Sequence, residues 1–169
     1  MARRRFGHEF RRSPDGGFIV DLTDWERELL EDLPRQLQEL LQSNDPSLRR
    51  LFPAAYHADS DAERNAEYQR YMHEELLASR MAAADMLAST ARAESLTAEQ
   101  LEAWMSCVNA IRLVLGTQLD VSEESDLIDD DDPRAPVFGV YSWLGMILEL
   151  CVEALHGEST MSFTAEDDA

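Results

Sequence analysis

The sequence predicts a mainly α fold, a helical bundle of four to five helices with a small N-terminal β-hairpin. Three Ser/Thr-x-x-Glu/Gln motifs, typical of helix N-termini, are each followed by a helical segment. Apolar residues recur at helical spacing along much of the chain. An Asp-Gly-Gly turn near the N-terminus separates two short extended runs. With 169 residues, 44% of them hydrophobic, the chain is long enough for one domain with a core.

The first predicted unit, residues 1–22, is an arginine-rich N-terminal β-hairpin. Asp15-Gly16-Gly17 is typical of a tight turn, and it lies between residues 4–11 and the extended run Phe18–Val20. Five arginines lie in the first of these segments or next to it. They are Arg3, Arg4, Arg5, Arg11 and Arg12.

The second predicted unit, residues 23–157, is the helical bundle. Its first helix opens at Thr23, where Glu26 completes a capping box. Pro34 lies inside this helix and is expected to kink or divide it, because proline lacks the backbone N–H. The apolar stripe of the helix is Trp25, Leu29, Leu33, Leu37, Leu40 and Leu41.

Three further helices are expected before residue 120. Asp45-Pro46 predicts a short helix through Leu51, because proline suits the first helical position. Capping boxes at Ser60 and Thr97 open a long helix to about residue 90 and another helix after it. The stripe of that last helix is Leu101, Trp104, Val108, Ile111 and Leu115.

The C-terminal part combines an acidic segment, a helix and a tail. Residues 122–132 are expected to form a solvated acidic segment. Gly157 is a predicted C-terminal cap, and residues 158–169 are expected to be a disordered acidic tail. Apolar residues at spacings of 4, 3, 4, 3 and 4 suit packing against a neighbouring helix. They are Val137, Tyr141, Leu144, Leu148, Cys151 and Leu155.

The net charge of -19 argues against broad nucleic-acid binding, since phosphate repels such a surface. Residues 1–12 nevertheless hold five of the 15 basic residues and only one of the 34 acidic ones. Contact with DNA or with an acidic partner is therefore expected only through these arginines, unless they pair with the acidic body of the molecule itself. Residues 126–132 are interpreted as a solvated loop or, alternatively, as a contact for a basic partner.

No run of eighteen apolar residues is present, which predicts no membrane span. The arginines near the N-terminus are not followed by an apolar stretch, so a secretory signal is not expected. We therefore expect a cytoplasmic location.

The residue patterns do not indicate catalysis. His73-Glu74-Glu75 lacks the second histidine of a zinc-protease motif, and Glu153 with His156 is a single Glu-x-x-His where a di-iron bundle needs two. Neither a glycine-rich phosphate loop nor a nucleophile elbow occurs. We expect no enzyme, no metal and no cofactor.

The two cysteines leave two interpretations open. Cys107 shares a helix face with Trp104 and Ile111, and Cys151 belongs to the last apolar stripe. Both could be reduced thiols that fill core space, as is common in the cytosol. Alternatively, packing of the two helices brings the thiols together, and a disulfide then needs Cα atoms within about 7 Å.

Several segments of the chain resemble the actinobacterial AosR family of oxidative stress transcriptional regulators, long known only as a domain of unknown function. The resemblance extends over about residues 4–156. Its segments are Arg4-Arg5-Phe6, Leu29-Leu30 through Leu40-Leu41, Asp45-Pro46-Ser47-Leu48-Arg49-Arg50-Leu51-Phe52-Pro53-Ala54-Ala55-Tyr56, Asn109-Ala110-Ile111-Arg112-Leu113-Val114-Leu115-Gly116-Thr117 and Tyr141-Ser142-Trp143-Leu144-Gly145.

The resemblance implies a cytosolic, non-enzymatic regulator of transcription. It implies thiol oxidation as the switch, for which Cys107 and Cys151 are the only thiols of this chain, and a stress sigma factor or RNA polymerase as partner. The resemblance does not decide the oligomeric state, and a homodimer is one of the alternatives. The alternative hypothesis is a constitutive adaptor linked to proteolysis, with structural cysteines, because members of the family are often encoded beside a proteolytic adaptor.

Overall fold

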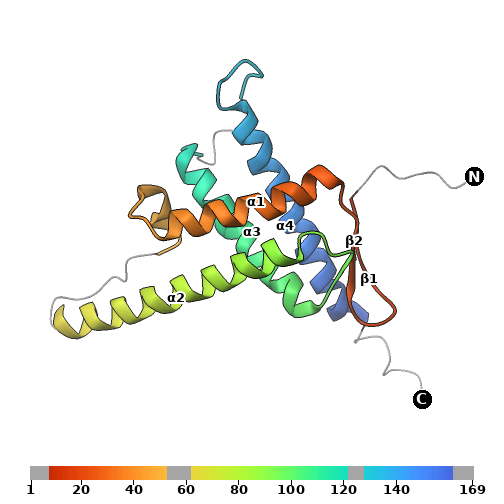
Figure 1. Ribbon diagram of the computed structural model, residues 1–169, viewed down its shortest axis with the longest axis horizontal. Coiled ribbons are helices and arrows are strands. Elements are labelled where there is room, and N and C mark those ends of the chain that lie inside the picture. Colours follow the sequence, from red (N-terminus) through yellow and green to blue (C-terminus); the bar gives the residue numbers. More distant parts are fainter. Residues whose placement is uncertain (1–7, 53–61, 122–127, 162–169) are drawn as a thin grey trace, which may run out of the picture.

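The computed structural model describes residues 8–52, 62–121 and 128–161. It confirms the predicted fold class, with four long helices and a small antiparallel sheet (Figure 1). In chain order the elements are β1 (Phe10–Arg12), β2 (Phe18–Val20), α1 (Asp24–Leu41), the 3-10 helix η1 (Pro46–Arg50), α2 (Ala62–Thr90), β3 (Ser95–Leu96), α3 (Ala98–Gln118) and α4 (Ala135–Met161).

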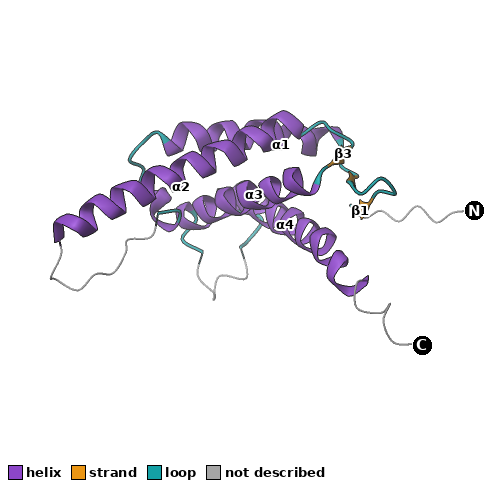
Figure 2. Cartoon of the chain, turned by 90° about the horizontal axis from the view of Figure 1, so that it is seen from below, coloured by secondary structure: helices purple, strands orange, loops and turns teal. Residues whose placement is uncertain are grey.

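The helices form two layers, with α1 and α2 stacked on α3 and α4 (Figure 2). α1 packs mainly on α2, α2 also packs on α3, and α3 packs on α4. The strands lie beside the start of α1, where β1 also touches α4. The core is continuous through both layers. Its largest fully buried side chains are Trp104, Phe18, Leu30, Leu51, Leu87, Leu96, Leu101, Leu144 and Ile147.

The predicted hairpin is present, and a third strand extends it. Phe10 pairs with Val20 in β1 and β2, and Gly16 takes a φ of +91°, which a residue with a side chain rarely adopts. The sequence did not indicate β3, since two residues are too few to show a period. Phe18 of β2 pairs with Leu96 of β3, and both side chains are buried.

Pro34 does not divide α1, so the division that was expected as one of two outcomes is wrong. The helix runs without a break from Asp24 to Leu41, and the proline itself is buried. Leu30 and Leu37 are buried before and after it. Packing on both sides of the proline therefore holds the two halves in one helix despite the missing N–H.

The other helix starts agree with their capping signals wherever the structure describes them. Asp45 accepts a hydrogen bond of 2.8 Å from the Ser47 N–H and opens η1, which is a 3-10 helix. At Thr97, the backbone N–H donates to Gln100 at 2.9 Å, and the Gln100 N–H donates to the threonine hydroxyl at 3.2 Å. The box at Ser60 lies outside the described residues.

α4 differs from its prediction at its end. Gly157 does not stop the helix, which continues to Met161. Among the described residues, Gly16 is the glycine with a positive φ, so Gly157 does not adopt the left-handed conformation of a glycine cap. Residues 162–169 lie outside the described part of the chain.

α4 is also long and apolar enough to cross a membrane, although the sequence has no eighteen-residue apolar run. Isolated polar residues, such as Glu149, interrupt the run without removing its overall apolar character. Only 17% of its most apolar window is buried within the fold. The core helix of a soluble protein passes the same criterion, and α4 does bury Leu144, Ile147 and Cys151. Most of the other apolar side chains of α4, such as Met146 and Leu148, are partly buried against the core, while Val137 is exposed.

Candidate functional sites

Both cysteines are buried in the core as free thiols. Cys107 on α3 is 1% exposed and Cys151 on α4 is fully buried. Burial raises the pKa of each thiol to about 12. Since the thiolate is the reactive form, only about one thiol in 10⁵ is ionised at neutral pH in this state.

The surroundings of the two thiols differ in one charged group. The guanidinium of Arg80, on α2, acts against burial and lowers the pKa of Cys107, whereas in the described part of the chain no such cation acts on Cys151. Arg80 donates to the Leu51 carbonyl oxygen at 3.1 Å, and its buried Nε has no hydrogen-bond partner among the residues that the structure describes. Cys107 is therefore the thiol whose ionised form a nearby cation, Arg80, can stabilise if water enters the core.

The helices present the two thiols to different neighbours. Five residues beyond Cys107, Arg112 faces α4, because its guanidinium lies over Tyr141 and against Gly145. Five residues turn an α-helix by about 500°, which leaves the two side chains about 140° apart. Cys107 accordingly faces α2 and Arg80, while Cys151 shares the buried stripe of α4 with Leu144. Pairing of the two thiols stays a prediction.

Two of the segments that resemble the AosR family, residues 109–117 and 141–145, meet because α3 packs closely on α4. A Cβ on Gly116 would lie 3.3 Å from Tyr141 Cε2, and a Cβ on Gly145 would lie 3.3 Å from Arg112 Nε. Each glycine thus accommodates a large side chain of the opposite helix, with the Arg112 guanidinium 4.6 Å from the Tyr141 ring centroid. These residues hold the bundle together.

The structure describes two of the five candidate contact arginines. Arg11 and Arg12 are exposed on β1, while Arg3, Arg4 and Arg5 lie outside the described residues. Arg11 lines a surface hollow whose other charged residues are of both signs, namely Asp21, Asp24, Glu94, Arg27 and Arg92. Both interpretations of the arginines, outward contact and internal pairing, stay predictions.

A buried carboxylate connects the N-terminal segment, α1 and α4, and the sequence showed only part of its role. Glu26 is fully buried. Its Oε2 accepts from the Thr23 N–H at 2.8 Å, as the capping box predicts, and also from the Thr23 hydroxyl at 2.7 Å. Its Oε1 lies 2.9 Å from the donating Trp143 Nε1 and 3.1 Å from His8 Nε2. These last two contacts come from distant parts of the chain, so local spacing could not reveal them.

The hydrogen bonds keep Glu26 ionised in spite of its burial. Burial raises the pKa of the carboxyl group, but the Thr23 N–H, the Trp143 indole, the Thr23 hydroxyl and the charge of His8 lower it. The lowering contributions prevail, and the pKa lies below the ordinary value of 4.5. Beside this junction, Trp25 is 55% exposed, and its ring centroid lies 6.0 Å from that of Trp143.

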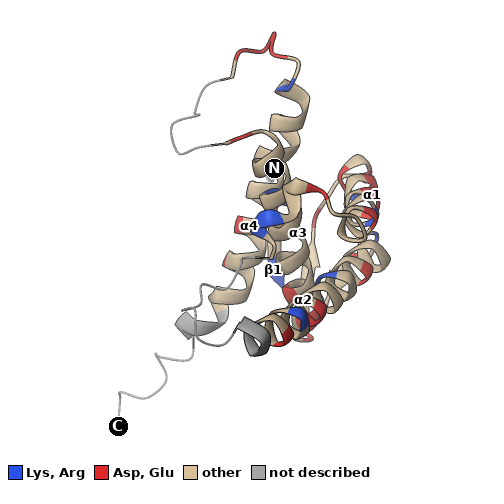
Figure 3. Ribbon diagram, turned by 90° about the vertical axis from the view of Figure 1, so that its left-hand side faces the viewer, with Lys and Arg blue, Asp and Glu red and all other residues tan. Residues whose placement is uncertain are grey.

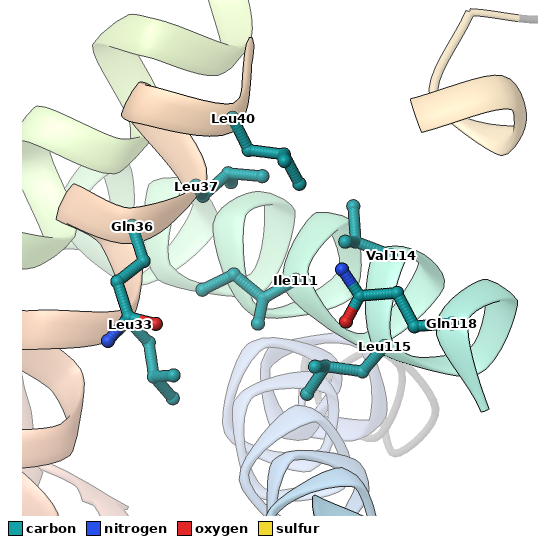
Figure 4. A pocket seen from close by; sticks show the side chains of 8 residues that line it. All are labelled: Leu33, Gln36, Leu37, Leu40, Ile111, Val114, Leu115 and Gln118. Carbon is teal, nitrogen blue, oxygen red and sulfur yellow. The ribbon is translucent and has the colours of Figure 1, made fainter. Parts of the chain in front are cut away.

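An apolar groove lies between the second half of α1 and the end of α3 (Figure 4). Its volume is about 170 Å³. The side chains of Gln36 and Gln118 lie on opposite sides of Ile111 in this view. The complete lining is Leu33, Gln36, Leu37, Leu40, Ile111, Val114, Leu115 and Gln118.

Acidic residues outnumber basic ones along α1, along α2 and in the segment before α4 (Figure 3). Asp129, Asp130 and Asp131 are exposed, as expected for a solvated acidic segment, and residues 122–127 are not described. Within the described ranges, no three His, Cys, Asp or Glu side chains are placed to hold a metal ion. The charge is therefore spread over the surface rather than gathered into a cation site.

Together, the fold and these features define a class of small acidic helical domain with buried thiols and an open apolar groove. The chain belongs to the family described as Domain of unknown function (DUF2017), whose model matches residues 7–155. This agrees with the resemblance seen in the sequence, because the related curated proteins carry the AosR name.

Two such relatives are the "Oxidative stress regulator AosR" of Mycobacterium tuberculosis (strain ATCC 25618 / H37Rv) and that of Mycobacterium bovis (strain ATCC BAA-935 / AF2122/97). The chain is 32% identical to each over 130 residues, which is 67% of this chain and 59% of the relative. It thus spans about three fifths of the length of these relatives. No solved structure matches the chain.

Proposed function

We propose that this chain is a regulatory domain of the oxidative stress response that controls transcription by binding a protein partner, without catalysis of its own. The observation that carries this proposal is the similarity to proteins named oxidative stress regulators over two thirds of the chain. By the resemblance, the partner is a stress sigma factor or RNA polymerase. A cytoplasmic location follows from that role.

The charge supports protein binding over direct DNA binding. A net charge of -19 repels phosphate over most of the surface. Contact with DNA would depend on the N-terminal arginines, of which Arg11 already has acidic neighbours. We therefore propose a protein partner as the main route to the promoter and DNA contact as secondary.

Thiol oxidation is the proposed switch, and the buried state of the thiols sets its conditions. In the reaction, a thiolate attacks peroxide to give a sulfenic acid and hydroxide, and the second thiol displaces water to form the disulfide. Two thiols and one peroxide yield one disulfide and two waters. With both pKa values at about 12, the first step requires a transient opening of the core. Cys107, next to Arg80, is the proposed first thiol to ionise.

The test is the thiol state before and after mild peroxide treatment, by intact mass and alkylation. We expect the loss of two alkylatable thiols and about 2 Da for an internal bond, or a dimer on non-reducing electrophoresis for an intermolecular one. The Cys107→Ser and Cys151→Ser double variant should lose every peroxide-dependent change in sigma-factor affinity. An unchanged response in that variant, or thiols that react only after unfolding, would exclude the thiol switch.

The burial of both cysteines also favours a second candidate function, that of a constitutive adaptor linked to proteolysis. Fully packed thiols with high pKa values behave as inert core residues. Capture of protease components, equal with and without peroxide, supports the adaptor. Oxidant-dependent capture of sigma factor or polymerase supports the regulator.

A further inference from the structure

The groove between α1 and α3 is an apolar surface left open by the packing of the bundle. α1 packs chiefly on α2, so its second half leaves Leu33 and Leu40 only partly covered. On α3, Leu115 is likewise partly covered, while Ile111 beneath it is 5% exposed. The groove therefore has a packed floor and apolar walls that are accessible from solvent.

The length of the groove matches two turns of a helix, and its volume of about 170 Å³ receives apolar side chains of a docked helix. Its lining runs from residue 33 to 40 on α1 and from residue 111 to 118 on α3, two turns of each helix. This corresponds to a length of about 10 Å, which accepts two turns of a docked helix with apolar residues at i, i+3 or i+4, and i+7. Gln36 and Gln118 lie at its sides, where their amides can hydrogen-bond a polar edge of such a helix (Figure 4).

The charges at the α1 rim select the partner. Asp32 and Glu39 lie four residues before and three residues after Gln36, so all three share one side of α1. Both carboxylates are exposed, and the one arginine between them, Arg35, is 3.7 Å from Asp32. The rim thus carries a net negative charge, and a second copy of this chain, at -19, would be repelled.

We propose that this groove binds an amphipathic helix of a partner protein, with an apolar stripe and basic flanks. The proposal rests on the proposed function in that it names where the protein partner docks. It does not depend on the cysteines, because none of the groove residues is a thiol.

The experiment uses the full reduced chain and two synthetic peptides of about 15 residues, long enough to form a helix on binding. Both carry the same leucine stripe, one with arginine flanks and the other with glutamate flanks. We expect the arginine peptide to bind, by fluorescence anisotropy, at least tenfold more tightly than the glutamate peptide. Equal affinities, or no binding of either, would overturn the proposal.

Variants locate the binding to the groove. Leu115→Ser should weaken binding at least tenfold, whereas Val137→Ser, at an exposed apolar residue of α4, should leave it unchanged. Asp32→Arg combined with Glu39→Arg should reverse the preference between the peptides without altering the core. Peptide affinities that change neither with Leu115→Ser nor with the charge reversal would refute the site.

Further measurements test two other occupants of the groove, the N-terminal segment of the same chain and a second copy. If removal of residues 1–7 tightened peptide binding tenfold or more, the groove would be filled by the chain's own arginine segment and not by a partner. If sedimentation showed a dimer that Leu115→Ser dissociates, the occupant would be a second copy. Repeating the binding in the cysteine-free double variant separates this proposal from the thiol switch, because failure of the switch leaves peptide binding intact.

Discussion

Replacement of Glu26 by glutamine tests the junction between α1, α4 and the N-terminal segment. The carboxylate is fully buried, and its partners in the described residues can all donate to it: the N–H and hydroxyl of Thr23, the Trp143 indole and His8. An amide has one oxygen and one NH₂ group. If its oxygen serves Trp143 and His8, its NH₂ faces the Thr23 N–H, and two donors then oppose each other.

The expected loss follows from these contacts. Hydrogen bonds to a buried charge are worth about 1.5 to 3 kcal/mol each, and an unpaired buried donor costs about 1 to 3 kcal/mol. Because some donors find water or turn away, we expect Glu26→Gln to lower the free energy of unfolding by about 2 to 4 kcal/mol. For a chain of this size, that corresponds to a fall in Tm of about 5 to 15 °C.

The pH dependence provides a second readout. The pKa of Glu26 is lower in the folded chain than its ordinary value of 4.5, so ionisation stabilises the fold above that value. This stability is lost as the pH falls through the folded pKa. The difference between wild type and variant should therefore be largest near pH 7 and shrink as the pH falls below 4.5, measured by urea unfolding at each pH.

Glu28→Gln is the matched control, because Glu28 is exposed on the same helix and should change stability little. If Glu26→Gln were as stable as Glu28→Gln at pH 7, the junction would not contribute to the fold. A difference that did not depend on pH would show that shape, and not charge, accounts for the effect.

Three further predictions concern the core. Arg27 donates to the carbonyl oxygens of Val20, Ala91 and Ala93, and lysine cannot reach all three. Arg27→Lys should therefore lower the free energy of unfolding in urea by about 2 kcal/mol and reduce amide protection in the sheet. Full protection in the variant would contradict this. Trp104→Phe should cost about 1 to 2 kcal/mol, since the fully buried indole donates to the Thr90 hydroxyl at 2.7 Å, and an unchanged Tm would count against that bond. Cys107 and Cys151 should both react with iodoacetamide about a thousandfold more slowly than a free cysteine at pH 7. The reaction rates should rise steeply in urea. Fast alkylation of the native chain would refute the buried state of the two thiols.

Local signals account for the part of the fold that could be predicted. The capping boxes at Thr23 and Thr97 mark α1 and α3, and Asp15-Gly16-Gly17 marks the hairpin turn. Each of these signals is complete within a few residues, because caps and turns satisfy backbone groups close in sequence. Errors arose where distant packing prevailed, as at Pro34, which is buried within a continuous α1.

The candidate sites depend on long-range contacts and were less predictable. The apolar stripes placed both cysteines in the core, but periodicity cannot tell which neighbour a face meets. For the same reason, the sequence did not show that Cys107 lies near Arg80 or that Trp143 reaches Glu26. The groove could not be foreseen either, because an unpaired helix face has the same spacing as a paired one.

The tryptophans make movements between the helices of this fold measurable by intrinsic fluorescence. Its three indoles occupy different surroundings: Trp104 is fully buried, Trp25 is 55% exposed, and Trp143 lies between them in exposure. Trp25 and Trp143 come from α1 and α4 and are 6.0 Å apart, so their emission reports on the distance between these helices. Separation of α1 from α4, whether by oxidation, acid or a docked helix, should appear as a change in intrinsic fluorescence without any added label.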